Sequence, residues 1–551
     1  MNYVDLDVDF GEYFVLPNLR LSSYFGRVRR GYDKEIRTRF FNPKLPTSKV
    51  QKKTLSEILD DWIQHLEPLK AKWPGMYEFE MDLAKKVGPM SIMLPLDKRM
   101  KDIDSYYESI LLDSKPISRK AIDLVCEEWS QVRPLRIRSQ KETVELMKKS
   151  TSSGSPFFDK KRDVVEDTVP CTIYQTSRDG FEDVVQELPR GKWGACAILG
   201  WRGQEGGPEA DDVKQRVVFM FPFSVNVREL QFYQVLIERA QALNLVPAWV
   251  SMEAVDQRIT RLFDTKRPRD RIVCTDFTKF DQHFNPVMQD AARQVFTYLL
   301  VHDRDSSNWL ESVFPIKYNV PLAYDFGKIR YGAHGMGSGS GGTNADETVA
   351  HRALQYEAAL RHRKMLNPNS MCLGDDGILT YPGITAKDVT DSYTEHGLEM
   401  NLSKQSESEV ECTYLRRYHH RDYRQDGVCV GVYSTCRALG RLAEQERFYD
   451  ADVWGPKMVA LRQLSILENV KYHPLREEFV DYCMQGDAYR LGVDIPGFLD
   501  NIDQEAKKAK ALMPDLLGYT RSEMSSEAGI GSWWVDIPGF LDNIDQEAKK
   551  A

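Results

Sequence analysis

The sequence lacks the signatures of secreted, membrane and zinc-dependent proteins. Its nine cysteines form no Cys-x-x-Cys pair and no paired Cys/His spacing, which argues against a disulfide framework or a structural zinc site. No apolar run reaches the roughly 18 residues of a membrane-spanning helix. The opening residues, Met-Asn-Tyr-Val-Asp-Leu-Asp, are acidic and unlike a secretory signal. We therefore expect a reduced, cytosolic chain without a membrane segment.

An excess of basic residues is also absent, since 74 Lys and Arg face 82 Asp and Glu and leave a formal net charge of −8. Nucleic-acid binding usually depends on neutralising phosphates, so this balance does not by itself favour it. Local basic clusters at 27–30, 148–149 and 266–271 could still line an enclosed channel. No Gly-x-x-x-x-Gly-Lys-Ser/Thr loop occurs, which leaves a helicase without support.

Two adjacent acids, Asp375 and Asp376, stand between the apolar runs 371–373 and 378–379. Glycines on both sides and β-compatible flanks predict a strand, a tight turn and a second strand, with the carboxylates at the tip. Two neighbouring anions at one point favour a bound cation. The triplet Gly374-Asp375-Asp376 alone is weak evidence for a metal site, and the motifs that accompany it in the sequence decide the interpretation.

A second acidic pattern begins at a short β-branched run that ends at Asp276, with Asp281 five residues later. If the strands that carry Asp276 and Asp375 are neighbours, their carboxylates converge and can hold two divalent ions about 4 Å apart. Oxygen ligands favour Mg²⁺ or Mn²⁺. The alternative is that Asp276 merely ends a strand and Asp281 caps a helix.

A glycine-rich loop lies between the two acidic patterns, at 335–344, and helical spacing follows it at Val349, Ala353 and Leu354. Such a loop lets backbone N–H groups and hydroxyls approach a phosphodiester closely. By itself it could be a plain turn. When it stands in the order acidic strand, Gly/Ser loop with helix, acidic hairpin, the loop becomes a specific indication of phosphodiester chemistry.

This ordered set resembles the viral RNA-dependent RNA polymerases, and most of all those of picobirnaviruses, then partitiviruses. Asp276 and Asp281 are similar to motif A, 338–343 to motif B, and 374–376 to motif C. Weaker similarities extend the likeness to roughly residues 150–420. They are 151–156 with motif G, 214–218 with motif F, 397–404 with motif D and 412–417 with motif E.

The resemblance implies catalytic roles. Asp276 and Asp375 would be metal ligands with Asp376 as an auxiliary ligand, for two Mg²⁺ ions that Mn²⁺ can replace. Lys404 would be the general acid that protonates pyrophosphate. The alternative for Lys404 is a solvated surface charge.

The resemblance also implies a nucleotide site and a template path. The expected nucleotide-binding residues are Lys214, Arg216, Asp281, Ser338, Thr343, Asn344 and Glu347. A carboxylate at Asp281 favours rNTPs over dNTPs, and Arg216 can contact phosphate in bidentate fashion. Relatives carry Asn or Asp where this chain has Glu347, so whether Glu347 or Asn344 completes the ribose contact is open. The expected template and primer contacts are Thr151, Ser152, Gly154, Gly337, Gly339, Arg416 and Arg417.

The implied fold is α+β, a right-hand arrangement of fingers, palm and thumb with an antiparallel-sheet palm and a closed fingers–thumb ring. The expected divisions are 1–60 for an extension bridging fingers and thumb, 61–225 and 286–330 for fingers, 226–285 and 331–425 for palm, 426–530 for thumb and 531–551 for a tail. The implied function is replication and transcription of a segmented double-stranded RNA genome. The implied partners are template and nascent RNA, rNTPs and a capsid protein, with a monomer acting inside the virion and in the host cytoplasm.

Residues 493–509 recur without a difference as 535–551. Repeats that build a fold diverge, so we favour a cloning duplication with a natural end near Trp534; a recent genuine duplication is the alternative.

Two competing functions remain open. A reverse transcriptase-like polymerase shares the palm but usually carries an aromatic residue at the Asp281 position. A catalytically inert palm could serve as an RNA-binding module, although every expected metal ligand is intact.

Overall fold

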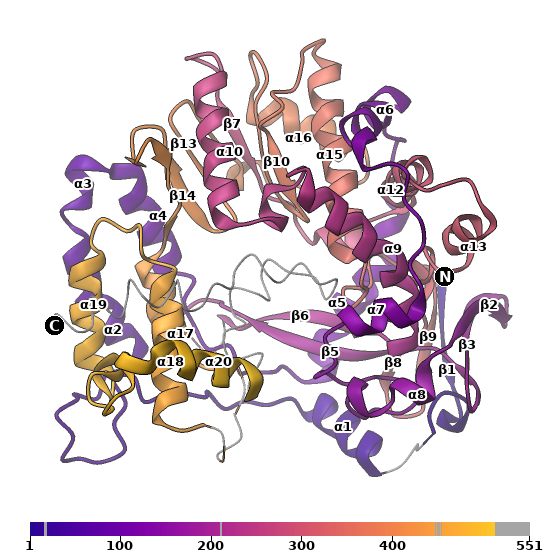
Figure 1. The fold of residues 1–551 in the computed structure, drawn as a ribbon, viewed down its shortest axis with the longest axis horizontal. Coiled ribbons are helices and arrows are strands. Elements are labelled where there is room, and N and C mark those ends of the chain that lie inside the picture. The colour runs from indigo at the N-terminus through magenta and orange to yellow at the C-terminus, as the bar shows by residue number, and fades with distance from the viewer. Residues whose placement is uncertain (16–18, 210–211, 447, 449–451, 453, 513–551) are drawn as a thin grey trace.

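Five sheets and the helices that cover them make up the described part of this computed structural model, which comprises residues 1–512 apart from 16–18, 210–211, 447, 449–451 and 453. None of the helices within these residues has the length and apolar character of a membrane span. Figure 1 shows the elements arranged in three groups, with the C-terminal helices within 435–512 at the left, the strands at 272–275 and 371–373 at the top, and the strands at 197–204, 214–220, 322–325 and 328–332 at the lower right.

The sheet at the top carries the acidic hairpin. It has the order β10 (Met371–Leu373), β11 (Asp376–Leu379), β7 (Ile272–Thr275) and β12 (Ser406–Ser408), and all of its pairings are antiparallel. Two helices, α15 (Thr343–Arg361) and α16 (Ala386–Thr394), pack against it. The expected antiparallel sheet backed by helices is therefore present.

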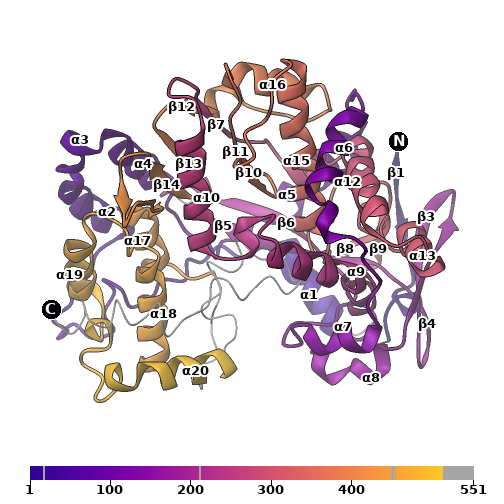
Figure 2. The same ribbon diagram turned by 45° about the horizontal axis from the view of Figure 1, so that its top comes forward.

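Helix α15 is enclosed by two further helices, α6 (Arg119–Glu128) and α12 (Pro286–Leu299) (Figure 2). Alanines on α15 are fully buried and allow this close packing. Helix α12 begins where Asn285 accepts hydrogen bonds from the amides of Val287 and Met288, with a proline as the first helical residue. Residues 286–299, expected in the fingers, thus lie against a palm helix.

A five-stranded sheet has the order β1 (Tyr3–Asp7), β9 (Lys328–Gly332), β8 (Leu322–Asp325), β5 (Ala197–Gln204) and β6 (Lys214–Met220). Only β5 and β8 pair in parallel. A three-stranded meander, β2 (Thr172–Arg178), β3 (Phe181–Leu188) and β4 (Gly191–Gly194), adjoins it. The long helix α9 (Phe223–Ala242) follows β6 and is buried along most of its length.

The N-terminal segment touches both sides of the molecule. Strand β1 completes the five-stranded sheet by pairing with β9. Farther along, the Thr38 amide donates to the Ala443 carbonyl at 2.9 Å, and the Phe41 amide donates to the Gly486 carbonyl at 2.8 Å. These contacts join the sheet that bears β6 to the C-terminal helices, and the role of residues 1–60 as a bridge between fingers and thumb stays a prediction.

The C-terminal helices are α17 (Thr435–Ala443), α18 (Pro456–Glu468), α19 (Arg476–Gly486) and α20 (Ile502–Leu512). Two N-terminal helices, α2 (Leu55–Ile63) and α4 (Pro74–Ala84), pack against α17 (Figure 1). Residues 61–84, expected in the fingers, therefore lie with the segment expected as the thumb. The spacing of apolar residues predicts a helix, but it does not say which partner buries its apolar face.

The remaining elements are α1 (Leu19–Arg30), α3 (Leu69–Lys72), α5 (Leu96–Glu108), α7 (Gln140–Leu146), α8 (Val165–Thr168), α10 (Met252–Thr265), α11 (Phe280–His283), α13 (Arg304–Ser312), α14 (Ile316–Asn319), β13 (Glu411–Tyr414), β14 (Arg417–His420), β15 (Arg424–Gln425), β16 (Val428–Cys429) and β17 (Val432–Tyr433). Among them, β13, β14 and β17 form a three-stranded sheet, and β15 and β16 form a two-stranded one. The first copy of the duplicated segment ends in α20, and the second copy lies outside the described residues.

Candidate active site

The hairpin β10–β11 is formed as the sequence predicts. Leu373 pairs with Asp376, which leaves Gly374 and Asp375 as the two-residue turn. Gly374 has a φ of +57°, and a type II′ turn requires glycine at this first central position. The prediction of a strand, a tight turn and a second strand is confirmed.

The register of β7 brings the third acid to the hairpin. Thr275 pairs with Gly377 in an antiparallel ladder, so the next residue, Asp276, lies beside Asp376. The expectation that the strands bearing Asp276 and the acidic pair are neighbours is confirmed. The backbone register thus places all three acidic residues at one end of the four-stranded sheet.

Burial makes these carboxylates costly to ionise. Burial first, and the adjacent Asp375 second, raise the pKa of Asp376 to about 7. Burial also raises the pKa of Asp375 and of Asp276 above their usual values. Added positive charge at this point would offset that cost.

The donor set suits a hard cation, because all three side chains offer carboxylate oxygens. In the described part of the chain, no three His, Cys, Asp or Glu side chains stand close enough as placed to hold a metal ion together. One Asp376 oxygen accepts a hydrogen bond from the Leu415 amide at 2.7 Å. This partial engagement fits Asp376 as an auxiliary ligand, with Asp276 and Asp375 as the main ones.

Three lysines lie near Asp276. After burial, which raises its pKa, Lys404, Lys86 and Lys214 act in the opposite direction and lower it. Lys404 and Lys214 are predicted site residues, whereas Lys86 comes from the loop after α4. Its sequence surroundings match no motif, so only the folded chain reveals it.

Three ionisable side chains meet around Asp281, on the short helix α11. Arg216 donates from Nη2 to Asp281 Oδ2 at 3.0 Å. The buried side chain of Glu347 lies beside the same carboxylate. Burial first, and Asp281 second, raise the pKa of Glu347 well above its ordinary value, so its protonated form is favoured.

Asn344, the alternative to Glu347, is oriented by Trp249, whose indole Nε1 donates to its Oδ1 at 2.7 Å. A side chain added at Gly374 would meet Glu347 at 3.4 Å and Asn344 at 3.9 Å. Both candidates for the ribose contact therefore stand next to the catalytic turn.

The glycine-rich loop packs closely against β6. A Cβ at Gly339 would lie 1.8 Å from the Phe219 carbonyl oxygen, so only glycine fits. Ser338 donates to the Val217 carbonyl at 3.4 Å, and Thr343 donates to the Gly337 carbonyl at 3.2 Å. The hydroxyls expected to face a phosphodiester are bonded to protein backbone here.

A buried polar network behind this loop is not apparent from the sequence. Glu229 accepts hydrogen bonds from the Ser340 hydroxyl and, at 3.2 Å, from the Gly341 amide. Nearby, fully buried Lys317 and Asp346 form an ion pair at 3.0 Å. These residues are far apart along the chain, and no local spacing links them.

The loop similar to motif G lies where β6 leads into α9. Gly154 has a φ of +61°, and a Cβ there would stand 2.9 Å from the Phe221 carbonyl oxygen. The Ser153 carbonyl accepts from the Phe223 amide at 2.8 Å. Ser152 is exposed, and Thr151 is partly exposed.

The two arginines expected to contact template or primer differ in position. Arg416 is exposed, with its guanidinium 3.8 Å from Glu205. Arg417 is buried and donates to the Asn469 carbonyl at 3.0 Å and to its Oδ1 at 3.2 Å. Arg417 begins β14, whose successive side chains alternate between two faces, and it points inward, so the structure does not place it against RNA.

Comparison with known proteins agrees with this geometry. A family model described as viral RNA-dependent RNA polymerase matches residues 94–430. A potential RNA-dependent RNA polymerase of human picobirnavirus (strain Human/Thailand/Hy005102/-) is 59% identical over 533 residues, covering 96% of this chain and 97% of that protein.

Two crystal structures superpose closely. The RNA-dependent RNA polymerase of a human picobirnavirus matches with a TM-score of 0.89 and 57% identity over 98% of both chains. An insertion-loop deletion mutant of such a polymerase matches with a TM-score of 0.87 and 58% identity, over 93% of this chain and 98% of that one. The expected right-hand polymerase fold is confirmed, and the chain belongs to the viral RNA-dependent RNA polymerases.

Proposed function

We propose that this polymerase copies RNA from rNTPs by a two-metal nucleotidyl transfer. The observation that carries the proposal is the convergence of Asp276 with Asp375 and Asp376 at the end of one sheet, where burial disfavours their charge. Two Mg²⁺ ions, or Mn²⁺ in their place, would activate the primer 3′-hydroxyl and neutralise charge on the departing pyrophosphate.

The positively charged side chains around Asp276 support the handling of triphosphate. Lys214 and Lys86 are in range to attract its phosphates, and Lys404 would give a proton to the leaving pyrophosphate. Arg216 binds Asp281 in the described state and can make bidentate phosphate contacts.

Sugar selection would belong to Asp281 and its protonated neighbour Glu347. With a Glu347 proton donated to one Asp281 oxygen, the other oxygen, which accepts from Arg216 here, keeps a lone pair that could accept from a ribose 2′-hydroxyl, which a deoxyribose lacks. A site that hydrogen-bonds a substrate hydroxyl rejects analogues without it. Asn344, which Trp249 orients and which lies near Gly374, would help to position the turn beside the ribose site.

The biological setting extends the proposal. By analogy with the human picobirnavirus relative, the chain would replicate and transcribe a segmented double-stranded RNA genome, inside the virion and in the host cytoplasm. Template and nascent RNA would pass Ser152, Gly337 and Arg416. A capsid protein is the proposed protein partner, and a monomer the proposed active form.

Incorporation of labelled nucleotide on single-stranded RNA with Mg²⁺ tests the proposal. We expect incorporation of rNTPs and not dNTPs, with Asp375→Ala reducing the rate at least about 1,000-fold because a metal ligand is lost. Asp123→Ala is the matched control, since Asp123 is an exposed acid in an ion pair with Arg119. Preference for dNTPs would indicate a reverse transcriptase, and RNA binding without synthesis in Mg²⁺ or Mn²⁺ would indicate an inert palm.

A further inference from the structure

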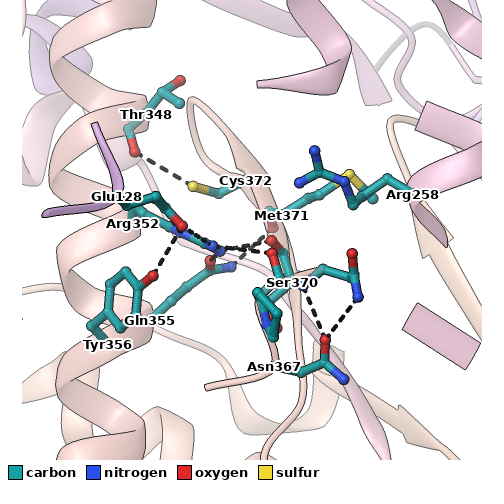
Figure 3. A network of polar contacts seen from close by, with 12 residues as sticks. Glu128, Arg258, Thr348, Arg352, Gln355, Tyr356, Asn367, Ser370, Met371 and Cys372 are labelled. Atoms are coloured by element: carbon teal, nitrogen blue, oxygen red, sulfur yellow. Dashed lines mark hydrogen bonds and ion pairs between the residues drawn. The ribbon is translucent and has the colours of Figure 1, made fainter. Parts of the chain in front are cut away.

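One face of α15 makes a row of polar contacts to the catalytic hairpin. Four residues at helical spacing take part, Thr348, His351, Arg352 and Gln355, and all of them are buried. Side chains three, four and seven positions apart share one side of a helix. Figure 3 shows the part of this row that surrounds Arg352 and Gln355.

The strands of the hairpin are held through their carbonyl groups. Gln355 donates from Nε2 to the Met371 carbonyl at 2.9 Å and to the Ile378 carbonyl at 3.3 Å. Met371 and Ile378 face each other across β10 and β11, so one amide contacts both strands. Arg352 donates from Nη1 to the Ser370 carbonyl at 2.6 Å, where β10 begins.

The turn of the hairpin is held by the same helix. The Gly374 amide donates to Thr348 Oγ1 at 2.9 Å, and the Gly374 carbonyl lies 2.8 Å from His351 Nδ1. The hairpin is therefore bonded to α15 at the base of its strands and at the turn that carries Asp375.

Arg352 is itself fixed by the helix α6. Its Nε donates to Glu128 Oε2 at 3.0 Å, and the Tyr356 hydroxyl donates to Glu128 Oε1 at 2.9 Å (Figure 3). Arg352 Nη1 also donates to Gln355 Oε1 at 2.9 Å, which orients the Gln355 amide toward the strands. A buried network whose members are bonded in this way has one favoured arrangement.

We propose that Arg352 and Gln355 are positioning residues that set where the hairpin presents Asp375 and Asp376 to Asp276. The inference rests on the proposed two-metal function and deepens it. Both side chains are buried, and both act through backbone carbonyls of the strands that carry the acids or of the residue before them. Displacement of a catalytic group by about 1 Å can cost about 100-fold in rate, so small shifts of this hairpin matter.

The decisive variant is Gln355→Met, which removes both amide donors at nearly constant volume. We expect kcat for single-nucleotide addition to fall about 10- to 100-fold, with the KM for rNTP changed by less than about three-fold, since loss of an outer partner of a metal site has effects of this size. Mn²⁺ binding to the RNA-free full chain, followed by electron paramagnetic resonance, should weaken by about 10-fold or more. Arg352→Lys, which keeps the charge but not the planar fork, should change both readouts in the same direction.

Tyr356→Phe is the matched control, because it removes a contact of the same network that does not reach the hairpin. It should leave kcat and Mn²⁺ affinity within about two-fold of the wild type. All measurements are made below the unfolding temperature of each variant. If Gln355→Met lowers that temperature but leaves kcat and Mn²⁺ affinity within about two-fold, the role is structural and the inference is wrong. If the wild type binds no Mn²⁺, the proposed metal site fails and this inference fails with it.

Discussion

At the level of single residues, burial changes the protonation of Glu347, which lies beside Asp281 and Arg216. By resemblance to the family, Glu347 stands at a position where relatives carry Asn or Asp and where we expect the ribose contact. In the structure its carboxyl group is buried beside another carboxylate, which favours the protonated form. A protonated Glu347 offers both a donor and an acceptor, as an amide does, so it can replace the Asn that the resemblance implies at this position in most relatives.

Glu347→Gln should therefore preserve the preference for rNTPs within about three-fold, because an amide still donates to Asp281. Asp281→Ala should reduce that preference about 10-fold or more, since the acceptor for the 2′-hydroxyl is gone. The ratio of kcat/KM for rNTP and dNTP measures both effects. If Glu347→Gln loses selectivity as fully as Asp281→Ala, Glu347 works as an anion and the protonated form is the wrong assignment.

At the level of elements, the glycine-rich loop depends on α9 behind it. Glu229 on α9 holds Ser340 and Gly341, and burial raises the pKa of Glu229 to about 7. The loop that leads into α15 is thus held by the Glu229 carboxyl group, whose charge changes near neutral pH. This arrangement is invisible to motif comparison, because α9 carries none of the expected site residues.

The raised pKa of Glu229 predicts how pH affects stability. Between its ordinary value of 4.5 and about 7, the folded state keeps a proton that the unfolded state releases, so stability falls as pH rises through this window. Glu229→Gln should remove that decline, which amounts to about 3 kcal/mol for a shift of this size. Denaturant unfolding of both proteins at pH 5 and pH 8 measures it. Equal declines in wild type and variant would contradict the assignment.

For the whole molecule, contacts between segments far apart in the sequence join an N-terminal helix to the C-terminal helices. Glu80 of α4 is fully buried and accepts from the Ser434 hydroxyl at 2.7 Å and the Thr435 amide at 2.8 Å, at the start of α17. His473 Nε2 lies 2.9 Å from the same carboxylate. Burial opposes ionisation, but His473 and the donors of α17 outweigh it and lower the pKa of Glu80.

Glu80→Ala should destabilise the protein by about 3 kcal/mol or more, because the buried donors and His473 lose their acceptor. A lowered pKa means that this stabilisation is present above the ordinary value and is lost as pH falls through the folded value. Denaturant unfolding gives the loss, and Glu67→Ala, an exposed acid in an i,i+3 pair, is the control. Matching effects of the two substitutions would contradict the packing role of Glu80.

Local sequence was sufficient to locate the catalytic hairpin, the strand that ends at Asp276 and the helix after the glycine-rich loop. Those features depend on turn chemistry and on alternation or helical spacing within about 15 residues, which the amino-acid order displays directly. The resemblance to viral polymerases extended the prediction from these local features to the whole right-hand fold. Folding was needed to show that α2 and α4 pack on α17, that Arg417 points inward, and that Lys86, Glu229, Arg352 and Gln355 join the site. Those contacts connect residues from 16 to 373 positions apart. They depend on which surfaces of the folded chain bury each other, which no local pattern in the sequence specifies.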